Sequence, residues 1–270
     1  MKVLVTGGAG FIASNLVDNL ISQGHDVAII DNLTTGKEEN INSKATFYKE
    51  DIGNTEGLEK IFAEEKPDIV NHHAAQVDLR RSVGDPLYDA QVNIIGSLNL
   101  INISSTHNVK RFIYASTGGA VYGEPEYLPV DEKHIVDPQS QYGVSKHTVE
   151  HYLFVFRQTH KLSYTVLRYP NVYGPRQDPH GEAGVVAIFT EQMLDGKQST
   201  VFGDGTKTRD YVYVGDLVSA NMSAMFNDAQ NFNQNLSSWD ASSVTNMDYM
   251  FDGASALSST NKYLIHQNTT

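Results

Sequence analysis

The chain has 270 residues, a formal net charge of −12 and a calculated pI of about 5.2. This length is enough to bury a sizeable core, and the acidic balance argues against a nucleic-acid partner because the basic residues do not cluster. The absence of cysteine excludes disulfides, thiolate metal sites and a cysteine nucleophile.

The N-terminus does not resemble a secretory signal. The first five residues, MKVLV, are followed almost at once by glycines, so the apolar run of a signal peptide is missing. No apolar stretch approaches the length of a transmembrane helix. We therefore expect a soluble cytoplasmic protein that does not bind a membrane.

A glycine-rich turn follows the first predicted strand, residues 2–5. Residues 6–13 read TGGAGFIA and lead into a helical apolar pattern, which is the order of strand, turn and helix that a dinucleotide fingerprint requires. The glycines let the backbone approach a pyrophosphate at the helix N-terminus, and Ala13 is small enough for the third glycine position. The residues expected to contact the dinucleotide are Gly7, Gly10, Phe11 and Ile12.

A second strand is predicted over residues 26–30 and is followed by Asp31. An acid about twenty residues beyond the glycines is placed to bind the hydroxyl groups of the adenosine ribose. Asp31 favours NAD over NADP, because a 2′-phosphate would face its carboxylate. The neighbouring Asn32 is expected at the same site, and the positive charge of Lys37 in the following loop complicates the choice between the two cofactors.

Short apolar runs alternate with helical patterns along the rest of the first two thirds of the chain. Strands are predicted over residues 45–48, 68–71, 111–115 and 163–167, and helices over residues 55–65 and 90–106. This alternation predicts an α/β fold with a Rossmann-type, doubly wound parallel sheet. Ligands of such a sheet bind at the carboxyl ends of its strands.

Several side chains lie just beyond these strand ends or on an adjoining helix, where they can line the adenine and nicotinamide of a cofactor. They are Asp51, Ile52, Ala74, Ala75, Gln76 and Asn93. The adjacent His72 and His73 point to opposite faces of a strand and cannot both bind one metal ion. We interpret both histidines as structural and predict no metal site.

Tyr142 and Lys146 are four residues apart in a stretch with helical character. An i,i+4 pair lies on one face of a helix, so the phenol and the ammonium can reach the same small volume. A lysine in this position can make the tyrosine acidic enough to carry a proton. The same spacing on an exposed helix would give two solvated neighbours, so the interpretation depends on the surrounding motifs.

Together these motifs resemble the extended short-chain dehydrogenases/reductases, and among them the UDP-glucose 4-epimerase group. The resemblance covers about residues 1–222. It is carried by residues 6–12 (TGGAGFI), 31–33 (DNL), 73–76 (HAAQ), 115–117 (AST), the pair Tyr142 and Lys146, and residues 167–176 (LRYPNVYGPR). It implies bound NAD, a UDP-sugar substrate and inversion of the sugar at C4 through a 4-keto intermediate.

The resemblance also implies catalytic roles. Tyr142, acidified by Lys146 and by the nicotinamide, would take the proton of the sugar 4-hydroxyl while a hydride moves to NAD. Thr117 would hydrogen-bond the same oxygen. Ser116 is the alternative, because one extra residue precedes the VYG motif of residues 121–123.

Two glycines after these hydroxyls favour epimerisation over dehydration. Sugar-nucleotide dehydratases of the same family carry an acid pair at this place, because the elimination of water needs an additional acid and base. Gly118 and Gly119 can supply neither group.

The resemblance places the substrate contacts within residues 171–210. Arg209 would pair with the diphosphate, although an ion pair with Asp210 or Asp216 is the alternative. Phe202 would cover the uracil, or else belong to a core. The remaining expected contacts are Asn171 and Val185 with the substrate, and Tyr169 and Pro170 with the cofactor.

The sequence changes in character after about Met222. The family pattern should continue with another strand and the rest of a substrate-binding lobe, and neither is recognisable. Instead MFNDA at 225–229 recurs as MFDGA at 250–254, in an Asn- and Ser-rich tail that resembles the repeats of bacterial surface lipoproteins. We expect a body over residues 1–224 with an incomplete C-terminal substrate lobe, and a repeat-like tail over 225–270.

Three functions are compatible with these motifs. The first is a UDP-sugar 4-epimerase, the second an NAD-binding module whose turnover is impaired by the loss of the lobe, and the third an epimerase or reductase for another nucleotide sugar. Family members often dimerise through two helices per subunit, which match residues 90–106 and 142–159 here. A homodimer is therefore expected.

Overall fold

The structure is a computed structural model, and it describes residues 1–180, 184–201, 203–206 and 208–226. The chain divides into two compact units, Met1–Val214 and Gly215–Thr270. Phe202 and the expected repeat-like tail lie outside the described residues, except for Met225 and Phe226 at the end of a helix.

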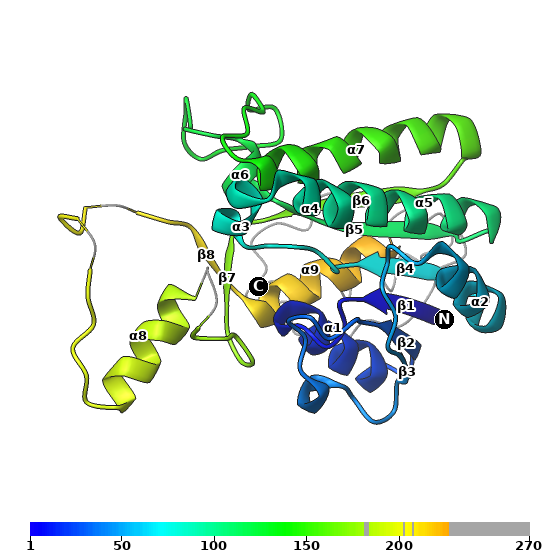
Figure 1. Cartoon of the computed structure of the whole chain (residues 1–270), viewed down its shortest axis with the longest axis horizontal. Coiled ribbons are helices and arrows are strands. Elements are labelled where there is room, and N and C mark those ends of the chain that lie inside the picture. Colours follow the sequence, from blue (N-terminus) through cyan, green and yellow to red (C-terminus); the bar gives the residue numbers. More distant parts are fainter. Residues whose placement is uncertain (181–183, 202, 207, 227–270) are drawn as a thin grey trace, which may run out of the picture. The chain divides into compact units, whose positions relative to one another are not determined.

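Six parallel strands form the central sheet of the first unit (Figure 1). They are β1 (Lys2–Thr6), β2 (Asp26–Ile30), β3 (Thr46–Tyr48), β4 (Ile69–His72), β5 (Arg111–Thr117) and β6 (Tyr164–Tyr169). Their order in the sheet is β3-β2-β1-β4-β5-β6. The chain thus builds outward from β1 in one direction and then in the other, which confirms the predicted doubly wound fold and puts the carboxyl ends of all six strands at one end of the sheet.

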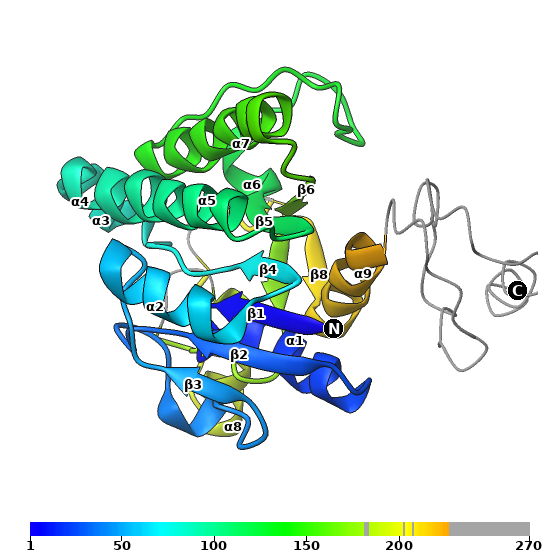
Figure 2. The same cartoon turned by 90° about the vertical axis from the view of Figure 1, so that its right-hand side faces the viewer.

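Helices connect these strands. They are α1 (Phe11–Ser22), η1 (Glu38–Asn40), α2 (Thr55–Glu65), α3 (Leu79–Gly84), α4 (Pro86–Ala90), η2 (Gln91–Gly96), α5 (Ser97–Thr106), α6 (Gly118–Val121) and α7 (Gln141–His160). Helices α2, α5 and α7 lie side by side over one face of the sheet, and α1 covers the other (Figure 2).

The helix predicted over residues 90–106 is interrupted. Its first part, η2, is a π-helical turn that joins α4 to α5. A Cβ on Gly96, the last residue of η2, would lie 2.7 Å from Cδ1 of Ile52, so the glycine lets this side chain pack closely against the turn. π-helical turns are frequent at functional sites, and this one carries Asn93.

The core lies between the sheet and the row of α2, α5 and α7. The four inner strands, β1, β2, β4 and β5, are buried on both faces, which explains why they read as continuous apolar runs rather than as alternating ones. Complete burial of one such large apolar side chain stabilises the fold by roughly 1.5–3 kcal/mol. Fully buried examples are Leu4, Phe62, Leu100, Phe112 and Tyr114.

A smaller element group follows β6 in the first unit. It consists of a two-stranded parallel sheet, β7 (Asn171–Tyr173) with β8 (Tyr211–Tyr213), and helix α8 (Val185–Leu194). Helix α9 (Val214–Phe226) begins at the last residue of this unit and forms the described part of the second. None of the helices in the described ranges is long and apolar enough to cross a membrane.

Candidate active site

The glycine turn after β1 brings the N-terminus of α1 beside the segment that follows β4. Gly7 has a φ of +71°, and its N–H donates to the carbonyl oxygen of Ile30 (2.8 Å). A Cβ on Gly7 would lie 2.7 Å from the backbone nitrogen of Ala74, so only glycine allows this close approach. Gly10 precedes α1, whose N-terminus has no side-chain cap and no acidic residue in its first turn. A helix end of this kind, here with Phe11 first, is suited to binding an anion.

Asp31 lies at the carboxyl end of β2 and holds the same turn in place. Its Oδ2 accepts a hydrogen bond from the N–H of Ala9 (3.0 Å), and its Oδ1 accepts one from the N–H of Leu33 (2.8 Å). A carboxylate oxygen can accept more than one hydrogen bond, so Asp31 can still bind hydroxyl groups. Lys37 has an exposed side chain, and its backbone N–H donates to the carbonyl oxygen of Ala9 (3.0 Å).

The ends of β2 and β3 are joined by two of the predicted cofactor residues. Nδ2 of Asn32 donates to Oδ2 of Asp51 (2.7 Å). Ile52 is 6% exposed and belongs to the core, so its side chain contributes to packing. A contact of Ile52 with a cofactor stays a prediction.

The loop after β4 is held by Asn93, which lies in η2. The Asn93 side chain accepts from the N–H of Gln76 (2.9 Å) and donates to the carbonyl oxygen of the same residue (2.9 Å). It also donates to Oδ1 of Asp89 (3.0 Å), so both of its amide hydrogens are used. Asn93 therefore supports the loop that contains Ala74 and Ala75, and a direct contact with the cofactor stays a prediction.

Asp89 is a site residue that the sequence did not reveal. Within PLYDA it resembles an exposed helical acid, yet it is fully buried in α4. Its Oδ2 accepts from the Ser145 hydroxyl (2.6 Å) and its Oδ1 from Nε2 of Gln76 (3.2 Å). The one available signal was its spacing of four residues before Asn93, which puts the two side chains on one helical face.

Helix α7 brings the predicted tyrosine and lysine to this end of the sheet. The Ser140 hydroxyl caps the helix by accepting from the N–H of Gly143 (3.1 Å). A Cβ on Gly143 would collide with the carbonyl oxygen of Ala120, so the glycine lets the first turn of α7 lie against α6. Tyr142 lies in this first turn, and Lys146 follows one turn later.

Lys146 is 3% exposed, and its Nζ lies 4.4 Å from the centroid of the Tyr114 ring. Burial lowers the pKa of Lys146 to about 7, although Glu150 and Asp89 act in the opposite direction. Burial, and then the charge of Asp89, raise the pKa of Tyr142 above its usual range. Of the two expected influences that would make Tyr142 acidic, Lys146 does not lower the pKa of Tyr142 here, so the phenolate depends on the second, a positively charged ligand.

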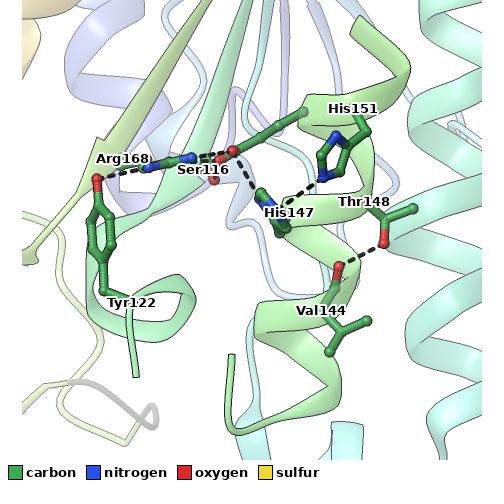
Figure 3. A network of polar contacts seen from close by, with 8 residues as sticks. Ser116, Tyr122, Val144, His147, Thr148, His151 and Arg168 are labelled. Carbon is green, nitrogen blue, oxygen red and sulfur yellow. Dashed lines mark hydrogen bonds and ion pairs between the residues drawn. The ribbon is translucent and has the colours of Figure 1, made fainter. Parts of the chain in front are cut away.

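Ser116, near the end of β5, belongs to a buried polar network. Its hydroxyl donates to Oε1 of Glu150 on α7 (2.6 Å). Arg168 on β6 binds the same carboxylate through Nη2 (2.6 Å) and Nε (3.1 Å), and donates to the Tyr122 hydroxyl (2.7 Å). In Figure 3, Ser116, Arg168 and His147 point toward this carboxylate. The hydrogen of the Ser116 hydroxyl is thus already donated within the network.

Thr117 is the last residue of β5 and is half-buried beside Tyr169, its register partner on β6. Its hydroxyl forms no hydrogen bond with another residue in the described part of the chain. The Tyr169 hydroxyl lies 3.1 Å from Nε2 of His73, and Pro170 follows directly. Of the two candidate hydroxyls, Thr117 is therefore the one whose hydrogen is not already donated to another described residue.

The two adjacent histidines are neutral near pH 7. His72 lies 2.7 Å from the Thr6 hydroxyl through Nδ1 and 2.9 Å from the Ser97 hydroxyl through Nε2, and burial lowers its pKa well below the usual value. Burial and the charge of Lys146 lower the pKa of His73 to about 3. These contacts fit the structural interpretation of both residues, and the described ranges contain no group of three metal-ligating side chains.

Three of the predicted substrate residues, Asn171, Val185 and Arg209, lie in the part of the first unit that follows β6. The backbone N–H of Asn171 (3.2 Å) and its Nδ2 (3.0 Å) both donate to the carbonyl oxygen of Asp210, which ties β7 to β8. Val185 is the first residue of α8 and is half-exposed. Arg209 is exposed, and its guanidinium donates to the carbonyl oxygen of Thr208 (2.8 Å). It forms no ion pair with Asp210, which is also among the described residues.

Two family descriptions match the chain. Residues 3–235 match the NAD dependent epimerase/dehydratase family. Residues 215–269 match a family described as Mycoplasma protein of unknown function, DUF285. The two matches overlap over residues 215–235, which include most of α9.

Curated relatives and solved structures share most of the chain. A putative UDP-glucose 4-epimerase of Methanocaldococcus jannaschii is 49% identical, over 83% of this chain and 73% of its own length. The crystal structure of UDP-glucose 4-epimerase with UDP-glucose from Thermotoga maritima has 54% identity and a TM-score of 0.82, over 83% of this chain and 73% of its own. That of Thermus thermophilus UDP-glucose 4-epimerase with NAD has 48% identity and a TM-score of 0.80, over 84% and 75%.

Proposed function

Because the chain belongs to the NAD dependent epimerase/dehydratase family, we propose that it uses NAD to invert a nucleotide sugar at C4, of the UDP-glucose and UDP-galactose type. Relatives with 46% and 49% identity are described as UDP-glucose 4-epimerases, the latter as putative. The observation that carries the proposal for this chain is the buried Lys146 one helical turn after Tyr142, at the strand end where Thr117 offers a free hydroxyl.

The glycine turn fits NAD. The positive φ of Gly7 and the uncapped N-terminus of α1 leave a place for a pyrophosphate beside Ala74, and Asp31 can accept hydrogen bonds from a ribose. When bound, NAD supplies a hydride acceptor for the sugar C4 and a positive charge near Tyr142. Asp31 disfavours a 2′-phosphate by like-charge repulsion.

Tyr142 acts as the base in our proposal. It takes the proton of the sugar 4-hydroxyl, and Lys146 stabilises the phenolate through its charge. The Thr117 hydroxyl binds the same sugar oxygen and keeps it in line with Tyr142. After the 4-keto sugar has turned, the hydride would return to C4 on the opposite face and Tyr142 returns its proton to the oxygen.

The UDP moiety is expected at the smaller element group. The exposed guanidinium of Arg209 can bind a diphosphate with two parallel hydrogen bonds. Asn171 and Val185 are at the starts of β7 and α8, and Phe202 is the remaining proposed contact. Arg209 is the residue whose loss should weaken UDP-sugar binding without weakening NAD binding.

We further propose that residues 1–224 form the NAD-binding body and that 225–270 form a separate tail of surface-lipoprotein type. The match of residues 215–269 to a second family supports a change of sequence type in this region. The chain also covers only 73% of the length of its curated relative from Methanocaldococcus. The match to a second family favours a second candidate function, an NAD-binding module with impaired turnover.

A homodimer is the proposed assembly. Large apolar side chains are exposed along the two helical segments expected to form the interface, residues 90–106 and 142–159: Ile95, Val144 and Val155. A hollow of about 390 Å³ lies between these segments and includes Ile94 and Val144 in its lining. Light scattering on the purified chain tests this assembly, and a monomeric mass at micromolar concentration would contradict it.

The test of the function is conversion of UDP-galactose to UDP-glucose by the purified full chain, with its NAD content measured in the same sample. Tyr142→Phe is the control, because it removes the proton-carrying oxygen alone. Turnover that Tyr142→Phe abolishes supports the epimerase. NAD retention and stabilisation by NAD, without turnover, would support the binding module instead.

A parallel assay with UDP-N-acetylglucosamine tests the range of substrates. A structure with 40% identity and a TM-score of 0.78 is a UDP-N-acetylglucosamine 4-epimerase from Methanobrevibacter ruminantium, in complex with UDP-N-acetylmuramic acid. Faster turnover of the N-acetylated sugar would reassign the substrate and leave the reaction type unchanged.

A further inference from the structure

We propose that Asp89 is the buried counter-charge of Lys146 and a positioning residue of the proton-transfer site. This inference rests on the proposed function for its catalytic meaning. It rests on geometry alone for the link between Asp89, the catalytic helix and the cofactor loop.

Asp89 has no access to solvent, and its carboxylate accepts hydrogen bonds from three other elements. The donors are the Gln76 side chain of the loop after β4 (3.2 Å), the Asn93 side chain of η2 (3.0 Å) and the Ser145 hydroxyl of α7 (2.6 Å). All three donors are neutral. They solvate the carboxylate, but they do not cancel its charge.

The position of Ser145 connects this carboxylate to the proton-transfer pair. Ser145 directly precedes Lys146 and follows Tyr142 within one helical turn. Of the other two donors, Gln76 belongs to the loop after β4, where Ala74 approaches Gly7, and Asn93 of η2 holds the Gln76 backbone through two hydrogen bonds. Asp89 thus fixes the first turns of α7 relative to the loop that borders the dinucleotide site.

Lys146 is the buried cation next to this charge along the chain, because it directly follows Ser145, whose hydroxyl donates to Oδ2 of Asp89. In the described ranges Asp89 forms no ion pair, whereas the other buried carboxylate near Lys146, that of Glu150, is already paired with Arg168 at 2.6 Å. A carboxylate without a cation is costly in a low-dielectric interior, so an ammonium in the same buried volume stabilises both groups.

The remaining groups near Lys146 include one other negative charge, that of Glu150, which raises the pKa of Lys146 more than Asp89 does but is already paired with Arg168. They are Tyr114 from β5, whose ring lies under the ammonium, His72 and His73 at the end of β4, and Tyr142 and Glu150 from α7. The histidines are neutral near pH 7, and the tyrosines carry no negative charge there. Asp89 therefore supplies the unpaired negative charge.

The charge acts on both members of the pair in the same direction. It favours the ammonium form of Lys146, and it disfavours the phenolate form of Tyr142. Removing it should therefore shift the titration of the pair as a whole to lower pH, whichever residue is assigned to each step.

Asp89→Asn and Ser145→Ala separate the charge from the hydrogen bonds. Asp89→Asn removes the charge and keeps the shape of the side chain. Ser145→Ala removes the 2.6 Å hydrogen bond and keeps the charge. The readout is the ultraviolet absorbance of the Tyr142 phenolate as a function of pH in the NAD-loaded full chain, with Tyr142→Phe as the blank. It does not require turnover.

In Asp89→Asn we expect the phenolate titration to move to lower pH by about one unit, together with both limbs of the pH profile of kcat where the chain turns over. In Ser145→Ala we expect the titration to stay within about 0.3 pH unit of the native value and the retention of NAD to fall. An unchanged titration in Asp89→Asn would overturn the proposal, and so would equal shifts in both variants.

The native chain provides a second measurement, should Asp89→Asn fail to fold. The carboxyl carbon resonance of Asp89 reports whether this side chain is ionised at pH 7. An ionised carboxylate supports the proposal, and a protonated one would overturn it, because a neutral carboxyl group has no charge to offer Lys146. A chain without epimerase activity but with the expected titration shift would refute the proposed function and leave this inference standing.

Discussion

The hydroxyl of Ser116 donates to the carboxylate of Glu150 over 2.6 Å, so the strand residue and the helix residue are locked together. Both residues are buried, and Nη2 of Arg168 binds the other carboxylate oxygen, Oε2, of Glu150. The next residue, Thr117, points to the opposite face of the strand because side chains alternate along β5. The two adjacent hydroxyls therefore have different tasks.

Replacing each hydroxyl in turn tests this division. In Thr117→Val we expect kcat to fall by about 100-fold, because the sugar oxygen loses a positioned donor, while the melting temperature stays close to the native value. In Ser116→Ala we expect the fold to lose about 1–3 kcal/mol, because a buried carboxylate oxygen loses its donor, and kcat to fall less than tenfold.

Initial rates with UDP-galactose and thermal unfolding of both variants give these four values. The reverse pattern, with the larger rate loss in Ser116→Ala, would make Ser116 the catalytic hydroxyl. Such a result would also require the network around Glu150 to rearrange when the sugar binds.

Gly7→Ala should abolish NAD retention. The substitution puts a Cβ 2.7 Å from the backbone nitrogen of Ala74 and strains a φ of +71°. Gly24→Ala is the matched control, because Gly24 has a φ of +81° and open space around its Cβ position. The backbone strain of roughly 1–2 kcal/mol is common to both variants, and the collision is specific to Gly7→Ala.

We therefore expect both variants to be less stable, and Gly7→Ala alone to lose NAD on gel filtration. Absorbance of the released nucleotide measures the NAD content. If Gly24→Ala lost NAD to the same extent, general destabilisation would explain both results, and the close approach to Ala74 would not matter for binding.

Most of the sheet was predictable because its four inner strands are buried on both faces. Residues 26–30 and 111–115, for example, read as short apolar runs whose only stable place is between two helical layers, and both are strands in the structure. The glycine turn was equally predictable from the sequence, since Gly7 needs a backbone conformation that few other residues adopt. The three-residue strands β7 and β8 were not predicted, because neither was recognised as a separate apolar run, whereas the equally short β3 was.

The site was less predictable than the sheet, for electrostatic reasons. The spacing of Tyr142 and Lys146 fixes their common helical face, but not how deeply that face is buried. Because Lys146 is deeply buried, desolvation lowers its pKa, and the spacing does not reveal this burial. Asp89 lies in a sequence typical of an exposed helical acid. Its burial and its hydrogen bond from Ser145 depend on α7, which follows about fifty residues later.

Glu150→Gln should be strongly destabilising. Hydrogen bonds from Arg168 and Ser116 outweigh the burial of the carboxylate and lower the pKa of Glu150, so the ionised form stabilises the fold. Removal of one partner leaves the half-buried Arg168 guanidinium without its counter-charge, which costs about 3 kcal/mol. Glu56→Gln breaks an exposed ion pair with Lys60 and should cost about 0.5 kcal/mol or less.

Urea unfolding at pH 7 measures both costs, and equal values would show that the Glu150 network is no more important than a surface pair. The stabilisation by Glu150 should be complete above the pKa of an unfolded glutamate and be lost as the pH falls through the lower pKa of the folded state. The difference between native chain and Glu150→Gln should accordingly shrink below about pH 4.

Lys146 should destabilise the cofactor-free fold at neutral pH, because burial removes its ammonium group from water. Its pKa is about 7 in the folded chain and 10.5 in the reference state, so the unfolded chain binds more protons between these two values. Stability attributable to this residue therefore rises with pH from 7 to 10.5, and the total change is about 5 kcal/mol. Below pH 7 the lysine is protonated in both states, and its burial has its full cost.

Lys146→Met keeps an apolar stem of similar length and removes the charge. We expect the variant to be more stable than the native chain at pH 7 and the difference to shrink as the pH rises toward 10.5. Urea unfolding of both proteins, free of NAD and at several pH values, measures this difference. A constant difference across the range would mean that Lys146 keeps its ordinary pKa in the fold, and a lower stability of Lys146→Met at pH 7 would mean that Asp89 and Glu150 outweigh the burial.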